Sequence, residues 1–296
     1  RNLGDPITTN LTSMIAINEY GIPDKFSNQV HQKAQQRANI SIENPIDLTN
    51  IPFISIDPSD ARDHDDAICA MKDLDNPGGY IIWVAIADVA KYILQGSELD
   101  LEALRRGNST YFPDLVVPMI PDILSGDLCS LKKGKLRAAL VVKIWLNKLG
   151  QKTSHNFFRC IIKNELTISY EEAQTIIDNS NDSNKKSKLK KLMRPLHAAY
   201  KLLEQQTKHR APLELELIEQ EILFDSVGEI RTLRSKERFE SHKIVEEFMI
   251  IANVCAAETI HKNKLPFLYR VHEPPTFEKL ISLKTIAKSL NVNLNT

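Results

Sequence analysis

Alternation between apolar and polar residues divides the chain into strand-like and helix-like segments. Runs rich in β-branched residues predict strands, whereas apolar residues that recur every three or four positions predict helices. The mixture of the two patterns predicts an α/β fold of the mixed α+β kind. The predicted strands lie at residues 51–56, 67–72, 80–87, 136–146 and 157–165. The predicted helices lie at residues 27–38, 101–106, 168–177, 189–209, 242–262 and 276–290.

Capping and turn residues mark several boundaries of these elements. Ser27 and Ser169 stand where a helix N-cap is expected, because a serine hydroxyl can accept a hydrogen bond from the first helical turn. Residues 73–79 are rich in Asp, Asn, Pro and Gly, which favours a turn between two strands. Alternation over residues 213–225 predicts one strand of a further hairpin, which turns at Gly228.

The helix predicted at residues 242–262 is apolar nearly all round, so it is expected to be buried. The presence of two polar residues on a helix that is expected to be buried then requires an explanation. At 100° per residue, Glu246 and Asn253 lie only about 20° apart on one face. They are interpreted as the wall of a site, and the alternative is a buried polar network closed by neighbouring donors.

An acidic loop joins the first two predicted strands. Five aspartates fall within the ten residues 57–66. A folded chain does not bring so much like charge together unless a cation or a basic partner neutralises it. Asp57 is expected to close one strand and Asp66 to open the next, so that both point into one concave site. Asp63 and Asp65 are expected to project from the same side of the loop.

Carboxylate ligands without Cys or paired His favour Mg²⁺ or Mn²⁺ over Zn²⁺. Two such ions roughly 3.5–4 Å apart are a common device for hydrolysing phosphodiesters. A structural cation and a solvated acidic turn remain as alternatives. An EF-hand calcium loop is disfavoured, because Arg62 or Ile68 stands at the sixth position, where Gly is needed.

Length and composition are those of a globular protein. The chain has 296 residues, enough for one large or two ordinary domains, with 42% hydrophobic and 26% charged residues. It shows no run long enough to span a membrane and no signal-peptide pattern at its start. The four cysteines are far apart and form no CxxC pair, which indicates buried thiols in a reducing compartment. We therefore expect a soluble, cytoplasmic protein.

The charge balance does not by itself predict nucleic-acid binding. The 38 basic and 38 acidic residues cancel, whereas a module that grips phosphates is usually basic. Binding in a local basic channel stays compatible with this balance. The lysines of residues 185–191 can touch phosphate, although a solvated helix start is the favoured explanation. Tyr111 and Phe112 lie in a proline-rich loop, where aromatic rings either stack on bases or join the core.

The sequence Asp-Pro-Ser-Asp-Ala-Arg-Asp-His-Asp-Asp-Ala at residues 57–67 resembles the signature of the RNB-domain exoribonuclease family, found in ribonuclease II and bacterial ribonuclease R. The similarity to the ribonuclease R form is the greater. The chain departs from the usual family pattern at residues 210–212, and Leu215 stands where relatives have a base-clamping aromatic residue. The second base-stacking residue is therefore not predicted. Similar blocks lie at residues 84–89, 109–131, 244–253 and 268–275.

The resemblance implies an RNB-type domain with a mixed or antiparallel sheet surrounded by helices and a deep RNA channel. It assigns residues 46–296 to this domain, incomplete at its C-terminus. Residues 1–45 would be a helical lead-in and the junction after an N-terminal OB-type domain. The implied activity is 3′→5′ hydrolysis of single-stranded RNA to nucleoside 5′-monophosphates by a two-metal mechanism.

The resemblance also assigns residues to this activity. It implies Mg²⁺, with Mn²⁺ as a substitute, as the cofactor and single-stranded RNA as the partner, with no membrane and no obligate protein partner. The alternatives are a noncatalytic RNA-binding module, an inactive fragment of such a nuclease, or a DNA-directed two-metal nuclease. The implied catalytic and metal-binding residues are Asp57, Asp63, Asp65 and Asp66, and the implied RNA-binding residues are Arg62, Tyr111, Glu246 and Asn253.

Overall fold

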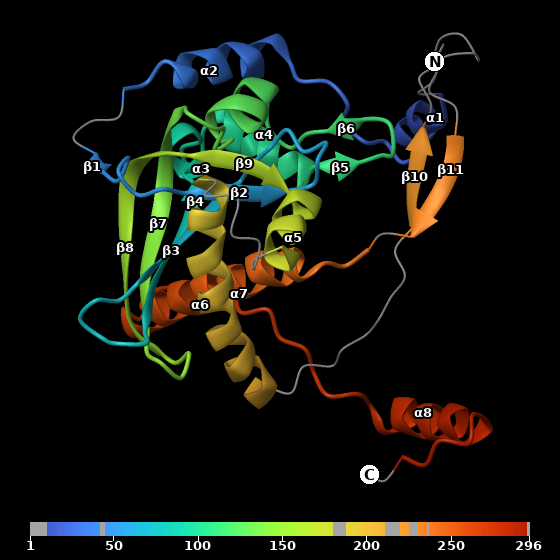
Figure 1. Cartoon of the computed structure of the whole chain (residues 1–296). Helices are drawn as coiled ribbons and strands as arrows, with labels where there is room; N and C mark the ends of the chain where they lie inside the picture. The colour runs from blue at the N-terminus through green and yellow to red at the C-terminus, as the bar shows by residue number, and fades with distance from the viewer. Residues whose placement is uncertain are drawn as a thin grey trace. The chain divides into compact units, whose positions relative to one another are not determined.

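The computed structural model describes residues 11–41, 45–179, 188–210, 220–224, 230–235 and 237–294 (Figure 1). Contacts within the chain divide it into two compact units, Arg1–Cys255 and Ala256–Thr296. The first unit contains the sheet and the acidic loop. The predicted division of the chain at residues 45 and 46 stays a prediction.

A seven-stranded mixed sheet forms the centre of the first unit, in the order β1-β8-β7-β4-β3-β2-β9. Neighbouring strands from β8 to β2 are antiparallel, whereas β1 and β9 pair in parallel with β8 and β2. This confirms the predicted mixture of strands and helices. The strands are β1 (Ile46–Asp47), β2 (Ile54–Asp57), β3 (Asp66–Lys72), β4 (Tyr80–Ala87), β7 (Leu136–Leu146), β8 (Lys152–Lys163) and β9 (Leu166–Ser169).

Hydrophobic residues on both faces of the sheet are buried by helices, so the central strands read as nearly continuous apolar runs. One face packs against α5 (Tyr170–Asp178), α6 (Lys188–Arg210) and the first part of α7 (Glu240–Lys262). The other packs against α2 (Asn28–Ala38), α3 (Val89–Tyr92), α4 (Glu98–Arg106) and the short helix Ile123–Leu128. Two separate apolar clusters therefore hold the sheet in place.

The sheet is tied together between strands that are far apart in its order. β8 ends at Lys163 and β9 begins at Leu166, although β7, β4, β3 and β2 lie between them in the sheet. A two-residue connection is too short to cross a flat sheet of this width, so the sheet must curl. Asn164, in this connection, is buried and donates from Nδ2 to the Ser55 hydroxyl at 2.7 Å and the Leu131 carbonyl at 2.6 Å.

Several predicted boundaries are confirmed. The hydroxyl of Ser27 caps α2, and Ser169 forms a capping box with Glu172 at the start of α5. The predicted hairpin is present as two strands, although its turn at Gly228 and the departure at Leu215 lie outside the described residues. No helix in the described part of the chain is long and apolar enough to cross a bilayer. The remaining elements are α1 (Leu11–Glu19), β5 (Thr110–Tyr111), β6 (Val116–Val117), β10 (Gln220–Phe224), β11 (Ile230–Ser235) and, in the second unit, α8 (Phe277–Ser289).

Candidate active site

The acidic loop joins the ends of two neighbouring strands, as predicted. Asp57 is the last residue of β2, and Asp66 is the first residue of β3. On its other side β2 pairs with β9, which places Ser169 opposite Asp57 and lets α5 begin at the next residue. The candidate site is therefore bounded by one end of β2, one end of β3 and the start of α5.

A buried serine holds the acidic loop in position. Ser130 is fully buried, and its hydroxyl accepts a hydrogen bond from the His64 amide at 3.0 Å. The same hydroxyl donates to the Arg62 carbonyl at 3.1 Å, and the Leu131 amide donates to the His64 carbonyl at 2.7 Å. Sequence reasoning did not single out Ser130, although it lies in one of the blocks that resemble the family. Its position in the loop's backbone network is apparent only once the strands are paired.

The four predicted aspartates influence one another electrostatically. Burial, and after it the negative charges of Asp57 and Asp65, together raise the pKa of Asp66 to about 7. Burial also raises the pKa of the Asp65 carboxyl, with additional contributions from Asp63 and Asp57, although the residue as a whole is exposed. Such shifts arise when carboxylates are close together and no cation neutralises them. The structure thus brings these four side chains into one electrostatic cluster.

His64 is bonded to the first aspartate of this cluster. Its Nδ1 lies 2.7 Å from Oδ2 of Asp57, and both side chains are largely buried. The hydrogen bond to Asp57 is the main reason why the pKa of His64 is raised. This contact occupies one oxygen of Asp57.

The carboxylate oxygens of the four aspartates are chemically suited to bind a hard divalent cation. Carboxylate oxygens are the preferred ligands of Mg²⁺ and Mn²⁺, and uncompensated negative charge at a buried site favours a bound cation. Among the described residues, however, no three His, Cys, Asp or Glu side chains are gathered closely enough to hold a metal ion as they stand. The metal centre therefore stays a prediction.

Tyr111 lies at this site and is not part of the core. Its side chain, at the end of β5, is 64% exposed, and its hydroxyl donates to Oδ2 of Asp63 at 3.0 Å. Partial burial, followed by the interaction with Asp63, raises the pKa of the phenol. The structure excludes the interpretation of Tyr111 as a core residue and leaves most of its ring free to contact a ligand.

A second tyrosine, which sequence reasoning missed, borders the same cluster. Burial raises the pKa of Tyr170 to about 12, and the charges of Asp57 and Asp66 contribute to the shift. The Tyr170 ring stacks on His242 with 3.8 Å between ring centroids, and Phe239 stacks on the same imidazole. The N-cap at Ser169 marks the next residue as the first of a helix. The pairing of β9 with β2, which was not predicted, is what brings Tyr170 beside Asp57.

The expectation that α7 is buried all round, with Glu246 and Asn253 inside, is wrong. The two residues do share a face, but both are exposed, because α7 buries only the opposite stripe. In the described residues neither hydrogen bonds to the aspartate cluster; Glu246 pairs with Arg238 at 2.6 Å. Glu247 is the more buried of the two glutamates, and Arg210 Nη2 donates to both its oxygens at 2.8 Å. The buried stripe consists of Ser241, Ile244, Val245, Phe248, Ala252 and Cys255.

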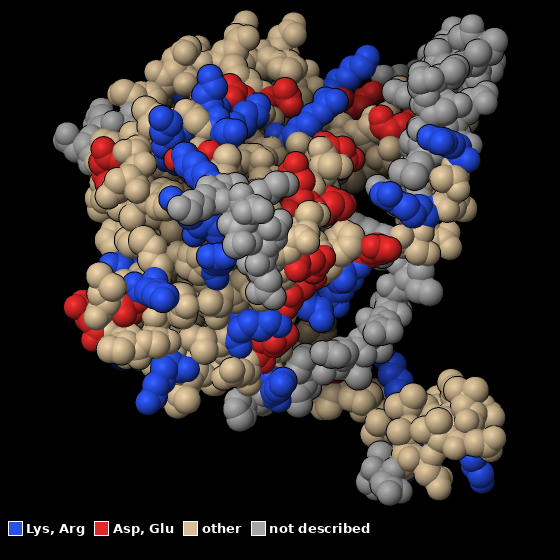
Figure 2. Space-filling model, viewed as in Figure 1, with Lys and Arg blue, Asp and Glu red and all other residues tan. Residues whose placement is uncertain are grey.

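Charged residues around the site are mixed in sign. Arg62 is exposed on the acidic loop itself. Asp88, which follows β4, is buried and makes no side-chain cap to α3; its Oδ1 lies 3.3 Å from Nη2 of Arg159. Figure 2 shows acidic and basic side chains interspersed on the face in view, in keeping with the zero net charge.

Comparisons with known proteins agree with this arrangement. A family model described as RNB domain matches residues 46–296. Ribonuclease R of Vibrio parahaemolyticus is 34% identical over 300 residues, which cover 99% of this chain and 35% of the relative. The chain thus spans about a third of the length of that curated relative.

Solved structures show the same fold. Mycoplasma genitalium RNase R in complex with ribose methylated single-stranded RNA matches with a TM-score of 0.88 and 27% identity, covering 98% of this chain and 46% of that one. The same protein in complex with double-stranded RNA matches with a TM-score of 0.89 and 27% identity, covering 98% and 52%. The sequence blocks, the mixed sheet and these matches lead to one conclusion: the chain belongs to the RNB-domain family, together with the ribonuclease R proteins.

Proposed function

We propose that the chain carries the hydrolytic centre of a 3′→5′ exoribonuclease, which degrades single-stranded RNA to nucleoside 5′-monophosphates with Mg²⁺ or Mn²⁺ as cofactor. The observation that carries the proposal is the cluster of Asp57, Asp63, Asp65 and Asp66, in which burial and like charge raise the pKa of Asp66 to about 7. The ribonuclease R relatives, one of them solved with single-stranded RNA, support RNA as the substrate.

Each named residue has a role in this proposal. The four aspartates would hold the cations, which when bound supply activation of water and stabilisation of the charge that develops on the phosphate. Ser130 keeps the loop in place through the His64 amide and the Arg62 carbonyl. The exposed ring of Tyr111 offers a surface on which a terminal base can stack.

Three further residues supply polar contacts for RNA. Arg62 carries an exposed guanidinium for phosphate on the acidic loop. Glu246 and Asn253 present carboxylate and amide groups on the exposed face of α7, where they can meet sugar hydroxyls or base edges. A deep RNA channel around these groups is part of the proposal.

The negative charge of the candidate site favours catalysis over simple RNA binding. A module that only binds RNA gains nothing from clustered carboxylates, because they repel phosphates. Divalent cations held by these carboxylates would offset that repulsion, so the cluster favours hydrolysis over binding alone. A DNA-directed nuclease would need the same carboxylates, and the substrate must be tested directly.

The test is a cleavage assay on 5′-labelled single-stranded RNA and on DNA of the same sequence, with Mg²⁺ or with EDTA. We expect a ladder that shortens from the 3′ end of RNA only, and only with Mg²⁺. Asp65→Asn, nearly isosteric but uncharged, should lower the rate at least about a hundredfold while RNA binding persists. Asp60→Asn is the matched control, because Asp60 is an exposed acid of the same loop outside the cluster.

Three outcomes would contradict the proposal. A rate for Asp65→Asn within a few-fold of the parent would remove the aspartate cluster from catalysis. Equal cleavage of DNA would favour the DNA-directed nuclease. RNA binding without cleavage would favour a noncatalytic RNA-binding module.

A further inference from the structure

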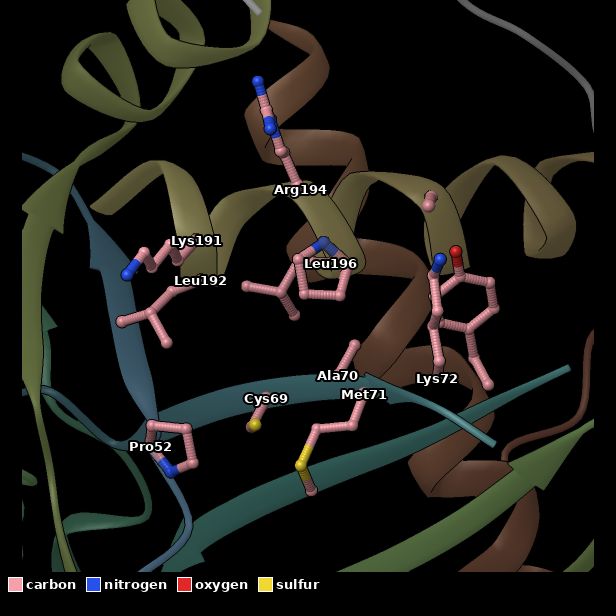
Figure 3. Close-up of a pocket in the computed structure, with 12 residues that line it drawn as sticks. Pro52, Cys69, Ala70, Met71, Lys72, Lys191, Leu192, Arg194 and Leu196 are labelled. Carbon is pink, nitrogen blue, oxygen red and sulfur yellow. The ribbon is translucent and has the colours of Figure 1, made fainter. Parts of the chain in front are cut away.

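A cavity of about 540 Å³ lies between β3 and α6, at the opposite end of β3 from Asp66 (Figure 3). Its floor includes Ala70 and Lys72 of β3, and Leu192 and Leu196 of α6 lie across from them. None of the residues proposed above for RNA hydrolysis lines it. The cavity is therefore separate from the candidate active site.

The cavity follows the edge of β3 and not one face of the sheet. Four consecutive residues, Cys69 to Lys72, line it, although neighbouring side chains of a strand point to opposite faces. β2 pairs with β3 only through Ile54 and Ile68. The next hydrogen-bonded pair would join Pro52 to Ala70, and proline has no N–H to donate. Pro52, which also lines the cavity, thus ends the pairing, and the rest of this edge has no strand beside it among the described residues.

The pattern of hydrogen bonds identifies the backbone groups at this edge. The Ala87 amide donates to the Asp65 carbonyl at 2.9 Å, and the Asp73 amide donates to the Gly79 carbonyl at 3.0 Å. The odd-numbered residues of β3 therefore turn their backbone groups toward β4. Because these groups alternate along a strand, Ala70 and Lys72 turn theirs to the open edge.

The opposite wall contributes another backbone acceptor. α6 contains Pro195, which lies on the cavity and cannot donate to the carbonyl four residues earlier. That carbonyl belongs to Lys191, which also lines the cavity. Both walls thus carry backbone groups that lack the partner a regular strand or helix would give them.

The charge of the lining indicates what kind of chain can satisfy these groups. Its charged side chains are Lys72, Lys191 and Arg194, and none of the lining residues that the structure describes is acidic. Lys72 and Lys191 are exposed, and neither forms an ion pair in the described part of the chain. The remaining lining is mostly apolar.

We propose that this groove binds an extended, acidic segment of a partner protein, which adds to β3 as a new strand beside Ala70 and Lys72. Strand addition to an open edge uses main-chain hydrogen bonds for affinity and side-chain pockets for specificity. Apolar side chains of the segment pack against Leu192 and Leu196, and its acidic side chains pair with Lys72 and Lys191. A nucleic acid would meet the same lysines, but it cannot satisfy a strand edge in an apolar groove. This inference is independent of the proposed nuclease activity.

The probe for the experiment is a fluorescent seven-residue peptide of alternating Glu and Val, with binding followed by anisotropy. We expect it to bind and to slow amide hydrogen exchange at Ala70 and Lys72. Lys72→Glu/Lys191→Glu should weaken binding at least about tenfold, because both charge contacts become repulsive. Lys148→Glu, an exposed lysine between β7 and β8, is the matched control and should change binding less than about twofold.

Other outcomes would overturn the inference. It fails if the peptide does not bind at about 1 mM, or if the double variant binds it as well as the parent does. A peptide with Pro at alternate positions cannot complete the strand pairing, so equal binding of that peptide would exclude strand addition. A tenfold loss of single-stranded RNA affinity in the double variant would assign the groove to nucleic acid. Unchanged thermal unfolding of the variants, whose altered lysines are exposed, keeps these results interpretable.

Discussion

At the scale of single residues, the cluster of aspartates makes stability depend on pH. Folding raises the pKa of Asp66 from 3.8 to about 7, and the pKa of Asp65 moves in the same direction. Between these values the folded state binds more protons than the unfolded state, so the free energy of unfolding decreases as pH rises. The raised pKa of His64 acts in the same sense, since its contribution is lost as pH rises through the folded value.

The prediction concerns thermal unfolding in EDTA. We expect the melting temperature to fall from pH 5 to pH 8, and Mg²⁺ to recover part of the loss at pH 8. Asp66→Asn should flatten the profile, because the neutral amide has no charged form to be penalised. A melting temperature that is constant or rises over this range in the parent chain would contradict the assignment of a raised pKa to Asp66.

Ser130 gives the second prediction at this scale. Ser130→Ala leaves the buried His64 amide without its acceptor, which should cost about 1–3 kcal/mol of unfolding free energy. It should also lower Mg²⁺-dependent RNA cleavage, because the loop that carries the aspartates is less firmly held. Denaturant unfolding and a Mg²⁺ titration measure the two effects. Ser125→Ala is the control, since among the described residues that hydroxyl bonds to the Ile120 carbonyl within its own segment and to no residue of the acidic loop.

The site residues that could be predicted from the sequence are those whose residue type by itself indicates a particular chemistry. Five aspartates in ten residues indicate a candidate site, and β-branched runs on both sides place Asp57 and Asp66 at strand ends, as the structure confirms. Ser130 and Tyr170 could not be predicted, because a serine and a tyrosine have many roles. Their position beside the loop depends on contacts between residues far apart in the chain.

At the scale of elements, the connection between β8 and β9 determines how the sheet is closed. Asn164 donates to residues of β2 and of the segment after the short helix, and its Oδ1 is buried without a partner in the described residues. Asn164→Ala should therefore cost about 2–4 kcal/mol, since it leaves the Ser55 hydroxyl and the Leu131 carbonyl unpaired. Asn156→Ala, an exposed asparagine of β8, should cost less than about 0.5 kcal/mol. Equal costs in denaturant unfolding would show that Asn164 does not close the sheet.

Helices and strands are predicted more accurately where the pattern of apolar and polar residues that indicates them is long. The long strand β7 is confirmed with its predicted bounds, and β8 begins earlier than predicted because its first half is polar. The four-residue β9 was not predicted, and its last two residues were placed at the start of the following helix, since so short a segment shows no reliable period. The burial of α7 was overestimated, because an apolar composition does not tell which face a helix turns to the core.

At the scale of the whole molecule, the balance of 38 basic and 38 acidic residues predicts how RNA affinity responds to salt. A neutral chain attracts RNA only through local contacts, and each phosphate contact with a single strand contributes a slope of about −0.7. For about two contacts, affinity should fall less than about tenfold between roughly 50 and 200 mM salt. Anisotropy titrations with labelled single-stranded RNA measure this slope. A loss of about a thousandfold would indicate many more phosphate contacts than the charge balance suggests.

The pairing of β2 with β9 also bears on the order in which the protein is made. Asp57 leaves the ribosome long before Ser169, the residue that lies opposite it in the finished sheet. Until β9 has been synthesised, β2 lacks one neighbour, and Tyr170 has not joined the aspartate cluster. A growing chain that already carries all the acidic residues thus still lacks one wall of its candidate site.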